Sequence, residues 1–173
     1  MSKKNFIKKL VYNSLNEQLD YKEEVTKDEF TDALLDLSTL DLEDDQVRYP
    51  KINHENKSYL FGGNKYDLYI LERSDLPTSG AFEIIMENKD EEVIGFIRGN
   101  KNKNTISFNL IHIKEEHRGQ GIGTDIYEKF LNDGYIIKSD KEITSDTYSM
   151  YDRLFLYGYK PLIYNDGRVG LMK

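Results

Sequence analysis

Cysteine and tryptophan are absent from the 173-residue chain, and proline occurs only three times. The lack of cysteine excludes disulfides, a cysteine-ligated zinc or iron–sulfur centre, and a cysteine nucleophile. The three histidines, at positions 54, 112 and 117, are too scattered for a histidine-rich metal site, so we expect no metal. No apolar run approaches the ~20 residues that span a bilayer, and residues 1–10 lack the apolar core of a signal peptide. We therefore expect a cytoplasmic protein with no membrane partner.

The charge of the chain is negative and unevenly distributed. Its net charge of −7 argues against broad binding to nucleic acid or to anionic membranes. Residues 15–45 hold twelve acids and only two lysines, so this stretch alone carries −10. The stretch is either a solvated helical face or an acidic surface that attracts a cationic substrate or partner. With 38% apolar and 32% charged residues, the composition is typical of a single folded domain over residues 1–173.

The spacing of apolar residues is helical in the first part of the chain and that of strands in the second. Residues 1–45 place apolar side chains at helical spacing, in one run from Phe6 to Leu15 and another from Phe30 to Leu37. Thr26 and Glu29 form a capping box before the second run. Residues 46–64 contain Pro50, Gly62 and Gly63 and are expected to form a loop. This predicts an N-terminal helical segment over residues 1–60, attached to a core over residues 65–173.

From Lys65 onward the spacing becomes that of strands. Four short runs separated by turns predict an antiparallel meander: Tyr66–Leu71, Phe82–Met86, Val93–Arg98 and Thr105–Ile113. Later elements are expected to be a helix over Ile122–Asp133, a strand over Tyr135–Lys138, a helix over Asp146–Tyr157, and two strands, Tyr159–Ile163 and Val169–Met172. This order predicts an α+β fold, with a central, mostly antiparallel twisted sheet flanked by helices.

The segment Ile111–Thr124 carries the strongest functional signal. A strand leads into a loop that contains Gly119, Gly121 and Gly123, and the loop opens an amphipathic helix. Glycines let backbone N–H groups converge, and the first helical turn adds unpaired donors and the positive end of its dipole. Such a nest is suited to a phosphate or a diphosphate.

Spacing excludes two nucleotide-binding motifs at this loop. A Walker A loop requires a lysine after its last glycine, whereas Thr124 follows Gly123 directly. A dinucleotide fingerprint requires a third glycine at position 124 or 126, where Thr124 and Ile126 stand. The preceding strands are moreover expected to be antiparallel rather than part of a β-α-β unit.

The pattern Arg-x-x-Gly-x-Gly, formed by Arg118, Gly121 and Gly123, resembles the diphosphate-binding motif of the GNAT family of N-acetyltransferases, which use acetyl-CoA. The order of elements is also similar: a hairpin and a long strand precede the loop, and a helix, a strand, another helix and Gly158-Tyr159 follow it. The resemblance covers about residues 65–173 and is most specific over residues 93–134. It implies a GNAT-like acyl-CoA-binding core with acetyl-CoA as co-substrate.

The resemblance also implies roles for particular residues. Main-chain groups of Ile111 and Ile113 would bond the pantetheine arm of the cofactor as an added strand does. Backbone N–H groups of the glycine loop would bind its diphosphate; the residues concerned are Arg118, Gly119, Gln120, Gly121, Ile122, Gly123 and Thr124. His112 alternates to the opposite face and is expected to be packed or hydrogen-bonded rather than catalytic. His117 either contacts the ribose phosphate or is a solvated loop residue.

The general base of the family is not matched. An acceptor amine must lose a proton before it attacks, because an alkylammonium has a pKa of ~10.4. In the family a base often projects from the fourth strand; the matching positions are Ser107 and Asn109, expected on the same face as Ile111. Neither side chain is a base, although either could orient a water. Glu83 and Glu87 on the neighbouring hairpin are reserve candidates.

Two further departures concern the proton donor and the acceptor pocket. The family's proton-donating tyrosine falls on Leu154, so Tyr151, one helical turn earlier, is the candidate donor to the thiolate, unless it is a core aromatic. The family also places two helices between its first two strands, and only a short loop stands there in this chain. If the helices of residues 1–45 take that role, their acids would border the acceptor, which is the reason to expect a cationic amine.

Three functions remain open at this point. The first is an acetyl-CoA-dependent N-acetyltransferase that moves an acyl group directly to an amine of unknown identity in a ternary complex. The second is a catalytically weak GNAT-fold protein that acts as an acyl-CoA-binding, protein-interaction or regulatory module. The third is a structural or interaction protein without CoA. The glycine motif favours the first and the side chains at the catalytic positions favour the second. A monomer or homodimer with no nucleic-acid partner fits all three.

Overall fold

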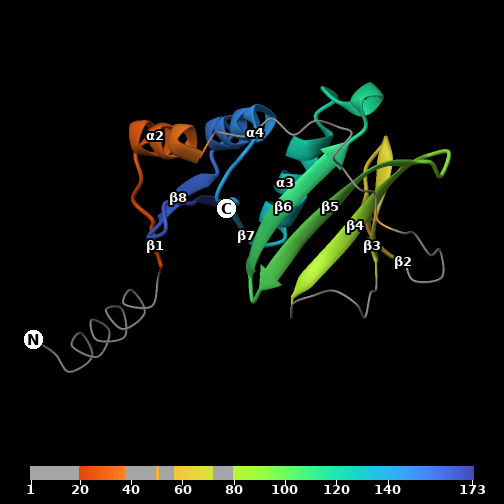
Figure 1. Ribbon diagram of the computed structural model, residues 1–173, viewed down its shortest axis with the longest axis horizontal. Coiled ribbons are helices and arrows are strands. Elements are labelled where there is room, and N and C mark those ends of the chain that lie inside the picture. Colours follow the sequence, from red (N-terminus) through yellow and green to blue (C-terminus); the bar gives the residue numbers. More distant parts are fainter. Residues whose placement is uncertain (1–19, 38–49, 51–56, 72–79) are drawn as a thin grey trace, which may run out of the picture.

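The computed structural model describes residues 20–37, 50, 57–71 and 80–173, and these form one mixed sheet of nine strands flanked by helices (Figure 1). The order of strands in the sheet is β1-β8-β9-β7-β6-β5-β4-β3-β2. The strands are β1 (Tyr21–Lys22), β2 (Lys57–Gly62), β3 (Tyr66–Leu71), β4 (Ala81–Asn88), β5 (Val93–Asn102), β6 (Thr105–Ile113), β7 (Ile136–Lys138), β8 (Lys160–Tyr164) and β9 (Val169–Met172). The predicted α+β fold class is confirmed.

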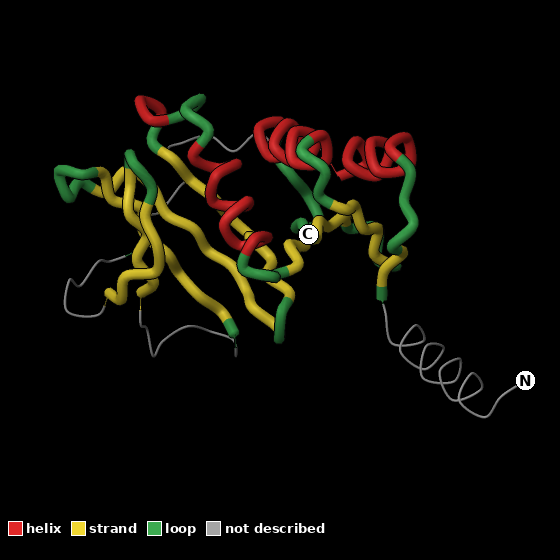
Figure 2. Tube along the Cα trace, turned by 180° about the vertical axis from the view of Figure 1, so that it is seen from behind, coloured by secondary structure: helices red, strands yellow, loops and turns green. Residues whose placement is uncertain are grey.

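Strands β2 to β6 form the predicted antiparallel meander, extended by one strand. Helix α3 (Ile122–Asn132) lies across one face of the sheet, as Figure 2 shows from behind. Its apolar side chains recur at helical spacing, and Ile126 and Phe130 are buried in the main core. Because this core lies between α3 and the sheet, the start of α3 is held against the end of β6.

Helices α2 (Lys27–Leu37) and α4 (Ser145–Leu156) lie side by side, and the rings of Phe30 and Phe155 pack 5.6 Å apart (Figures 1 and 2). The predicted capping box begins α2, since the N–H of Thr26 donates to Glu29 Oε2 at 2.9 Å and the N–H of Glu29 to Thr26 Oγ1 at 3.3 Å. Thr144 caps α4 in the same manner. None of the described helices is long and apolar enough to cross a membrane.

The loop prediction for residues 46–64 is wrong where β2 stands. Strand β2 is an edge strand with exposed side chains in its middle, so its sequence shows no alternation of buried and exposed residues. The two residues of β1 pair with β8 in a region predicted as helix. Leu35 is exposed and does not belong to the apolar stripe of α2. The predicted helical run from Phe6 to Leu15 lies outside the described residues.

The joint between β6 and β7 positions the functional site. These two strands run parallel and pair only over Thr105–Ser107 and Ile136–Lys138. Beyond that joint β6 continues to Ile113, whereas the chain after β7 turns away into α4. Within the described chain, the second half of β6 therefore has no strand neighbour on this side, and the sheet opens into a wedge.

Candidate functional site

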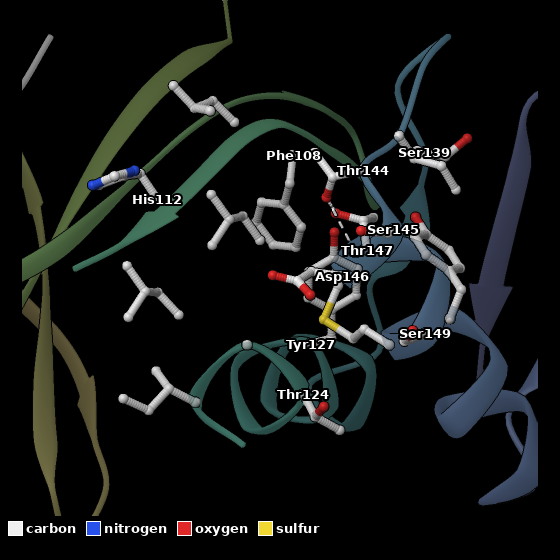
Figure 3. A pocket seen from close by; sticks show the side chains of 18 of the residues that line it. Phe108, His112, Thr124, Tyr127, Ser139, Thr144, Ser145, Asp146, Thr147 and Ser149 are labelled. Atoms are coloured by element: carbon white, nitrogen blue, oxygen red, sulfur yellow. Dashed lines mark hydrogen bonds between the residues drawn. The ribbon is translucent and has the colours of Figure 1, made fainter. Parts of the chain in front are cut away.

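A cavity of about 870 Å³ fills the wedge between β6 and α4. It is lined by the second half of β6, the loop that follows it, the first turns of α3, the loop after β7, and one side of α4. Figure 3 shows Phe108 of β6, Thr124 and Tyr127 of α3, and Asp146 of α4 gathered around it, whereas the ring of His112 points away from it. The predicted diphosphate loop and the predicted strand edge therefore open into one cavity.

A β-bulge at Asn109 sets which side chains of β6 face the cavity. Leu110 pairs with Arg98 and Phe108 with Gly99, so Asn109 is the extra residue on β6. The bulge resets the alternation of side chains. Phe108 and Ile111 both lie in the main core, although they are three positions apart and would face opposite sides of a regular strand. Asn109 itself lines the cavity.

The prediction that Ser107 and Asn109 share the face of Ile111 is wrong, because it assumed an unbroken strand. The side chain of Asn109 bonds that of Asn100, which is the cross-strand neighbour of Ser107, so Asn109 lies on the face of Ser107. By alternation with Phe108, Ser107 points to the opposite face, and it does not line the cavity. The reserve candidates Glu83 and Glu87 also lie away from the cavity. Both are buried in ion pairs, Glu83 with Arg98 at 2.6 Å and Glu87 with a lysine at 2.8 Å.

The prediction for His112 agrees with the structure. Its ring packs 5.7 Å from that of Phe96 on the face opposite Ile111 and Ile113, and Leu110 belongs to the same small cluster. The N–H of Lys114 donates to the carbonyl of Ile94 in β5. Because the main-chain groups of residues two apart on a strand turn the same way, those of His112 and Leu110 also turn to β5. Those of Ile111 and Ile113 consequently turn to the cavity, where they form the edge that an extended ligand could pair with.

The glycine loop forms a cradle of main-chain N–H groups at the wide end of the wedge. Gly119 and Gly121 have φ angles of +70° and +79°, a conformation that glycine adopts without strain, and a Cβ on either would meet no atom within 4 Å. Gly121 caps α3 without any side-chain hydrogen bond. The first main-chain bond of the helix runs from the N–H of Asp125 to Gly121, so the N–H groups before it point out of the helix.

The side chains of the loop hold its shape. Arg118 Nε donates to the carbonyl of Ile113 at 2.7 Å, which folds the loop back onto β6. Gln120 Nε2 donates to the carbonyl of Glu116 at 3.4 Å, and Gln120 does not line the cavity. The other residues predicted for the cofactor do line it: Ile111, Ile113, Arg118, Gly119, Gly121, Ile122, Gly123 and Thr124. Their binding role is a matter for experiment.

Tyr151 lies in the wall of the cavity with no exposed surface. Its ring packs against those of Phe30 and Tyr127, and its hydroxyl has no hydrogen-bond partner among the described residues by distance and angle. Burial raises the pKa of Tyr151 well above 10, and the neighbouring Tyr127, Tyr164 and Asp140 raise it further. The side chain is thus a neutral phenol, and a ligand atom would reach its hydroxyl only after a local shift of the wall.

Helix α2 does not wall the cavity, in contrast to the expectation that the acids of residues 15–45 border it. None of the described residues of α2 lines it, because α4 stands between α2 and the wedge (Figure 1). The acids that do line it come from the loop after β7 and from the start of α4: Asp140, Glu142 and Asp146. Sequence reasoning missed them because the parallel pairing of β6 with β7 was not predicted. Residues that follow parallel neighbours meet at one edge of a sheet.

The cavity is lined by basic residues at one end and by acidic residues at the other. His117, Arg118 and Arg153 line it at the end of the cradle, where α4 packs its Met150 sulfur against the first turn of α3. The three carboxylates line it near the joint of β6 and β7. Among the described residues, no group of three or more His, Asp or Glu is placed to hold a metal ion. An elongated ligand with an anionic end and a cationic partner would fit this polarity.

Comparison with known proteins gives a family match over more than half of the chain. The model of the acetyltransferase (GNAT) family matches residues 40–134. No curated protein sequence matches the chain significantly.

Solved structures that are similar to the chain have low sequence identity. One is a GNAT family acetyltransferase from Elizabethkingia anophelis with acetyl-CoA bound, at 14% identity and a TM-score of 0.41, over 64% of this chain and 99% of that one. Another is the N-acetyltransferase YhbS from Escherichia coli in complex with CoA, at 18% identity and a TM-score of 0.32, over 46% of each chain. A third is a proposed acetyltransferase from Deinococcus radiodurans R1, at 22% identity and a TM-score of 0.36, over 44% of this chain and 55% of that one. The chain therefore spans about half the length of the last two.

Proposed function

Because its residues 40–134 match the family model, the chain belongs to the acetyltransferase (GNAT) family, and we propose that it transfers the acyl group of acetyl-CoA to an amine. In this proposal the transfer is direct, with both substrates bound, and a cysteinyl acyl-enzyme is excluded because the sequence has no cysteine.

One observation carries this proposal: the bare main-chain cradle lines the same wedge as the edge of β6, which has no strand neighbour there among the described residues and whose Ile113 carbonyl accepts Arg118 Nε. A cradle of N–H groups at a helix start suits a diphosphate. The edge groups of Ile111 and Ile113 suit an extended arm that carries amide groups, because such an arm can pair as a strand does. Acetyl-CoA joins a diphosphate to an amide-bearing arm, and no other ligand class considered for the loop does so.

The basic end of the cavity supports the same ligand. Arg118 is tied to β6 through its Nε, and Arg153 of α4 also lines the cavity. Two guanidinium groups beside the cradle would offset the charge of the phosphates. In this proposal Arg118 and Gly119 to Thr124 surround the diphosphate, and Gln120 holds the loop from outside.

The binding part of the proposal is tested by thermal unfolding with CoA and acetyl-CoA. A ligand at 100 times its dissociation constant stabilises the folded state by about 2.7 kcal/mol, which for a chain of this size raises Tm by roughly 5–10 °C. ATP is the matched control, because it has phosphates and adenine but lacks the arm, and we expect it to raise Tm less. No shift with CoA would contradict the proposal.

The catalytic part is tested by the release of CoA thiol from acetyl-CoA in the presence of single amines. We expect release that depends on the amine and an acetylated product of matching mass. An acyl-CoA-binding module without turnover is the second candidate function, and the full burial of Tyr151 together with the placement of Ser107 on the far face favours it. A large thermal shift with no amine-dependent release over a broad panel would decide for the module.

A further inference from the structure

Three polar side chains form a hydrogen-bonded row that runs from β5 across β6 to the loop after β7, at the joint of the wedge. Asn100 of β5 donates through Nδ2 to Asn109 Oδ1 at 2.8 Å, and Asn109 Nδ2 lies 3.4 Å from Asp140 Oδ2. The other carboxylate oxygen, Asp140 Oδ1, accepts the N–H of Lys141 at 2.7 Å. Both oxygens of the Asp140 carboxylate therefore have a partner, the N–H of Lys141 at short distance and Asn109 at the long end of hydrogen-bond distance.

The row ends at the part of the cavity that lies farthest along β6 from the cradle. Asp140 follows β7 by two residues, and because β7 is parallel to β6 it stands level with the bulge at Asn109. Both residues line the cavity. The strand from Asn109 to Ile113 is roughly 13 Å long. An acyl carrier held at the cradle and extended along β6 therefore brings its reacting end toward Asp140.

The chemistry of amine acylation requires a proton acceptor at that end. Ser107 points away from the cavity, and the amide of Asn109 cannot take a proton. Of the three carboxylates that line the cavity, Asp140 is the one that lies within hydrogen-bond distance of the bulge of β6. We propose that Asp140 accepts the proton of an acceptor ammonium and that Asn109, held by Asn100, positions it. This inference rests on the proposed acyl transfer and names its acceptor class, a primary alkylamine that enters as a cation.

The protons and electron pairs of this step balance. The ammonium gives one proton to Asp140 and becomes a neutral amine with a free electron pair. The nitrogen forms its bond to the acyl carbon while the carbon–sulfur bond breaks and its electron pair leaves with sulfur. The second proton of the nitrogen passes to the sulfur, so that the products are an amide and a thiol. Asp140 then releases its proton to solvent.

The charges around Asp140 favour a cationic acceptor over a neutral or anionic one. Three carboxylates line this end of the cavity, and Asp146 points into it from α4 (Figure 3). The charged and titratable groups that face Asp140 are Lys141 and Glu142 in its own loop, Asp146 and Tyr151 on α4, and Arg168 in the turn between β8 and β9. Arg168 is paired with Asp166 and does not line the cavity, so the loop after β7 and the start of α4 present three carboxylates to it against Lys141 alone. An ammonium is therefore attracted to the end where its proton must be removed.

The experiment compares Asp140→Asn with wild type, using n-butylamine, 1,4-diaminobutane and spermidine as acceptors. Loss of a positioned base typically costs 10²–10⁴ in rate. We expect kcat/KM for the amine to fall at least 100-fold at pH 7, while the affinity for CoA stays within about twofold. The deficit should shrink as the pH approaches the pKa of the amine, because solution then supplies the neutral form.

Two further variants separate proton transfer from other effects. Glu142→Gln removes the same charge from the same cavity two residues away, and we expect a loss at least tenfold smaller than that of Asp140→Asn. Asn109→Ala should give an intermediate loss with the same dependence on pH, because it frees Asp140 to turn. A merely structural role of the row would lower Tm and CoA affinity without changing the pH profile.

The possible outcomes are distinct. If wild type acetylates an amine and Asp140→Asn keeps more than a third of its activity, or loses no more than Glu142→Gln, the role of Asp140 is wrong and the proposed function stands. If wild type acetylates none of these three amines and is active only on neutral or anionic acceptors of the broad panel, the acceptor class is wrong. If wild type binds CoA and acetylates nothing, both the transferase function and this inference fail.

Discussion

Gly121 has two separate properties that a single substitution can distinguish. Its φ angle of +79° lies in the left-handed region, and an added Cβ would project into open space beside the cradle. We expect Gly121→Ala to lower the free energy of unfolding by about 1 kcal/mol, since a residue with a Cβ adopts this conformation at that cost. We also expect it to weaken CoA binding at least tenfold, because the methyl group would occupy the space of the diphosphate.

Gly134 provides the matched control for this prediction. It ends α3 at a φ of +87°, and an added Cβ there also meets no atom within 4 Å, but Gly134 does not line the cavity. Gly134→Ala should therefore show the same loss of stability in urea unfolding with unchanged CoA affinity by calorimetry. Equal affinities for CoA in the two variants would show that the cradle is not the diphosphate site.

The residues that sequence could and could not identify differ in how local their signal is. The cradle was predictable because Arg118, Gly121 and Gly123 lie within six residues, so that their spacing alone encodes the turn and the helix start. Ser107 was misplaced because one bulge residue inverts every earlier side chain of β6, and the sequence does not mark the residue at which the bulge falls. Asp140 was overlooked because its position depends on a parallel pairing between strands that are far apart in the chain.

Helix α2 depends on its capping box, which makes its stability depend on pH. Hydrogen bonds from Lys22 and Thr26 lower the pKa of Glu29 from 4.5 to about 2. Because the folded state holds the ionised form, the carboxylate stabilises the fold above about pH 5, and this contribution is lost as the pH falls toward 2. We expect Glu29→Ala to lower Tm at pH 7 and to match wild type near pH 2, as measured by circular dichroism. A difference in Tm that is independent of pH would contradict this role.

Helix α3 is fixed to the β2–β3 hairpin by a hydrogen bond between Tyr66 and Asp125. Burial and this bond raise the pKa of Tyr66, so the hydroxyl remains a donor throughout the physiological range. We expect Tyr66→Phe to lower the free energy of unfolding by about 1.5–3 kcal/mol, the usual range for a bond to a charged group. Urea unfolding measures the change.

Tyr159 tests whether that loss is specific to the bond. Its hydroxyl lies 3.5 Å from Glu128 on the same helix, a distance at which little is gained. Tyr159→Phe should cost less than about 0.5 kcal/mol. If both variants lose the same stability, removal of any tyrosine hydroxyl near α3 explains the effect, and the Tyr66–Asp125 bond has no special role.

Elements with buried, regularly spaced side chains were predicted to within one or two residues at most ends. Strand β6 and helix α3 are examples, because one face of each lies in the core. Strand β2 was missed because it has exposed side chains on both faces and ends at two glycines, which together are typical of a loop. An edge strand of this kind is stabilised by its main-chain bonds to β3, which do not depend on side-chain type.

At the scale of the whole molecule, the sheet has two arms that meet at a joint of three residue pairs. One arm is the meander β2–β6, and the other contains β7, β9, β8 and β1. The joint is well packed, since Ile106 and Ile137 belong to the main core and are almost fully buried. We expect Ile137→Ala to cost about 2–5 kcal/mol in urea unfolding, whereas Leu156→Ala, at a side chain that is 62% exposed, should cost less than about 0.5 kcal/mol. If the two variants lose similar free energies of unfolding, packing at the joint contributes little to the stability of the fold.

A ligand that fills the wedge must contact both arms, and this is testable by hydrogen exchange. With CoA bound, we expect slower exchange of the amides of residues 111–113 and 122–124 on one arm and of residues 139–150 on the other. Strand β3 borders no part of the cavity and serves as the internal reference, because general stabilisation by a ligand slows its exchange as well. Slowing in excess of that in β3 on both arms would identify the wedge as the binding site. Slowing confined to residues 118–124 would mean that CoA is held by the loop alone, and the extended placement that brings its reacting end to Asp140 would then be wrong.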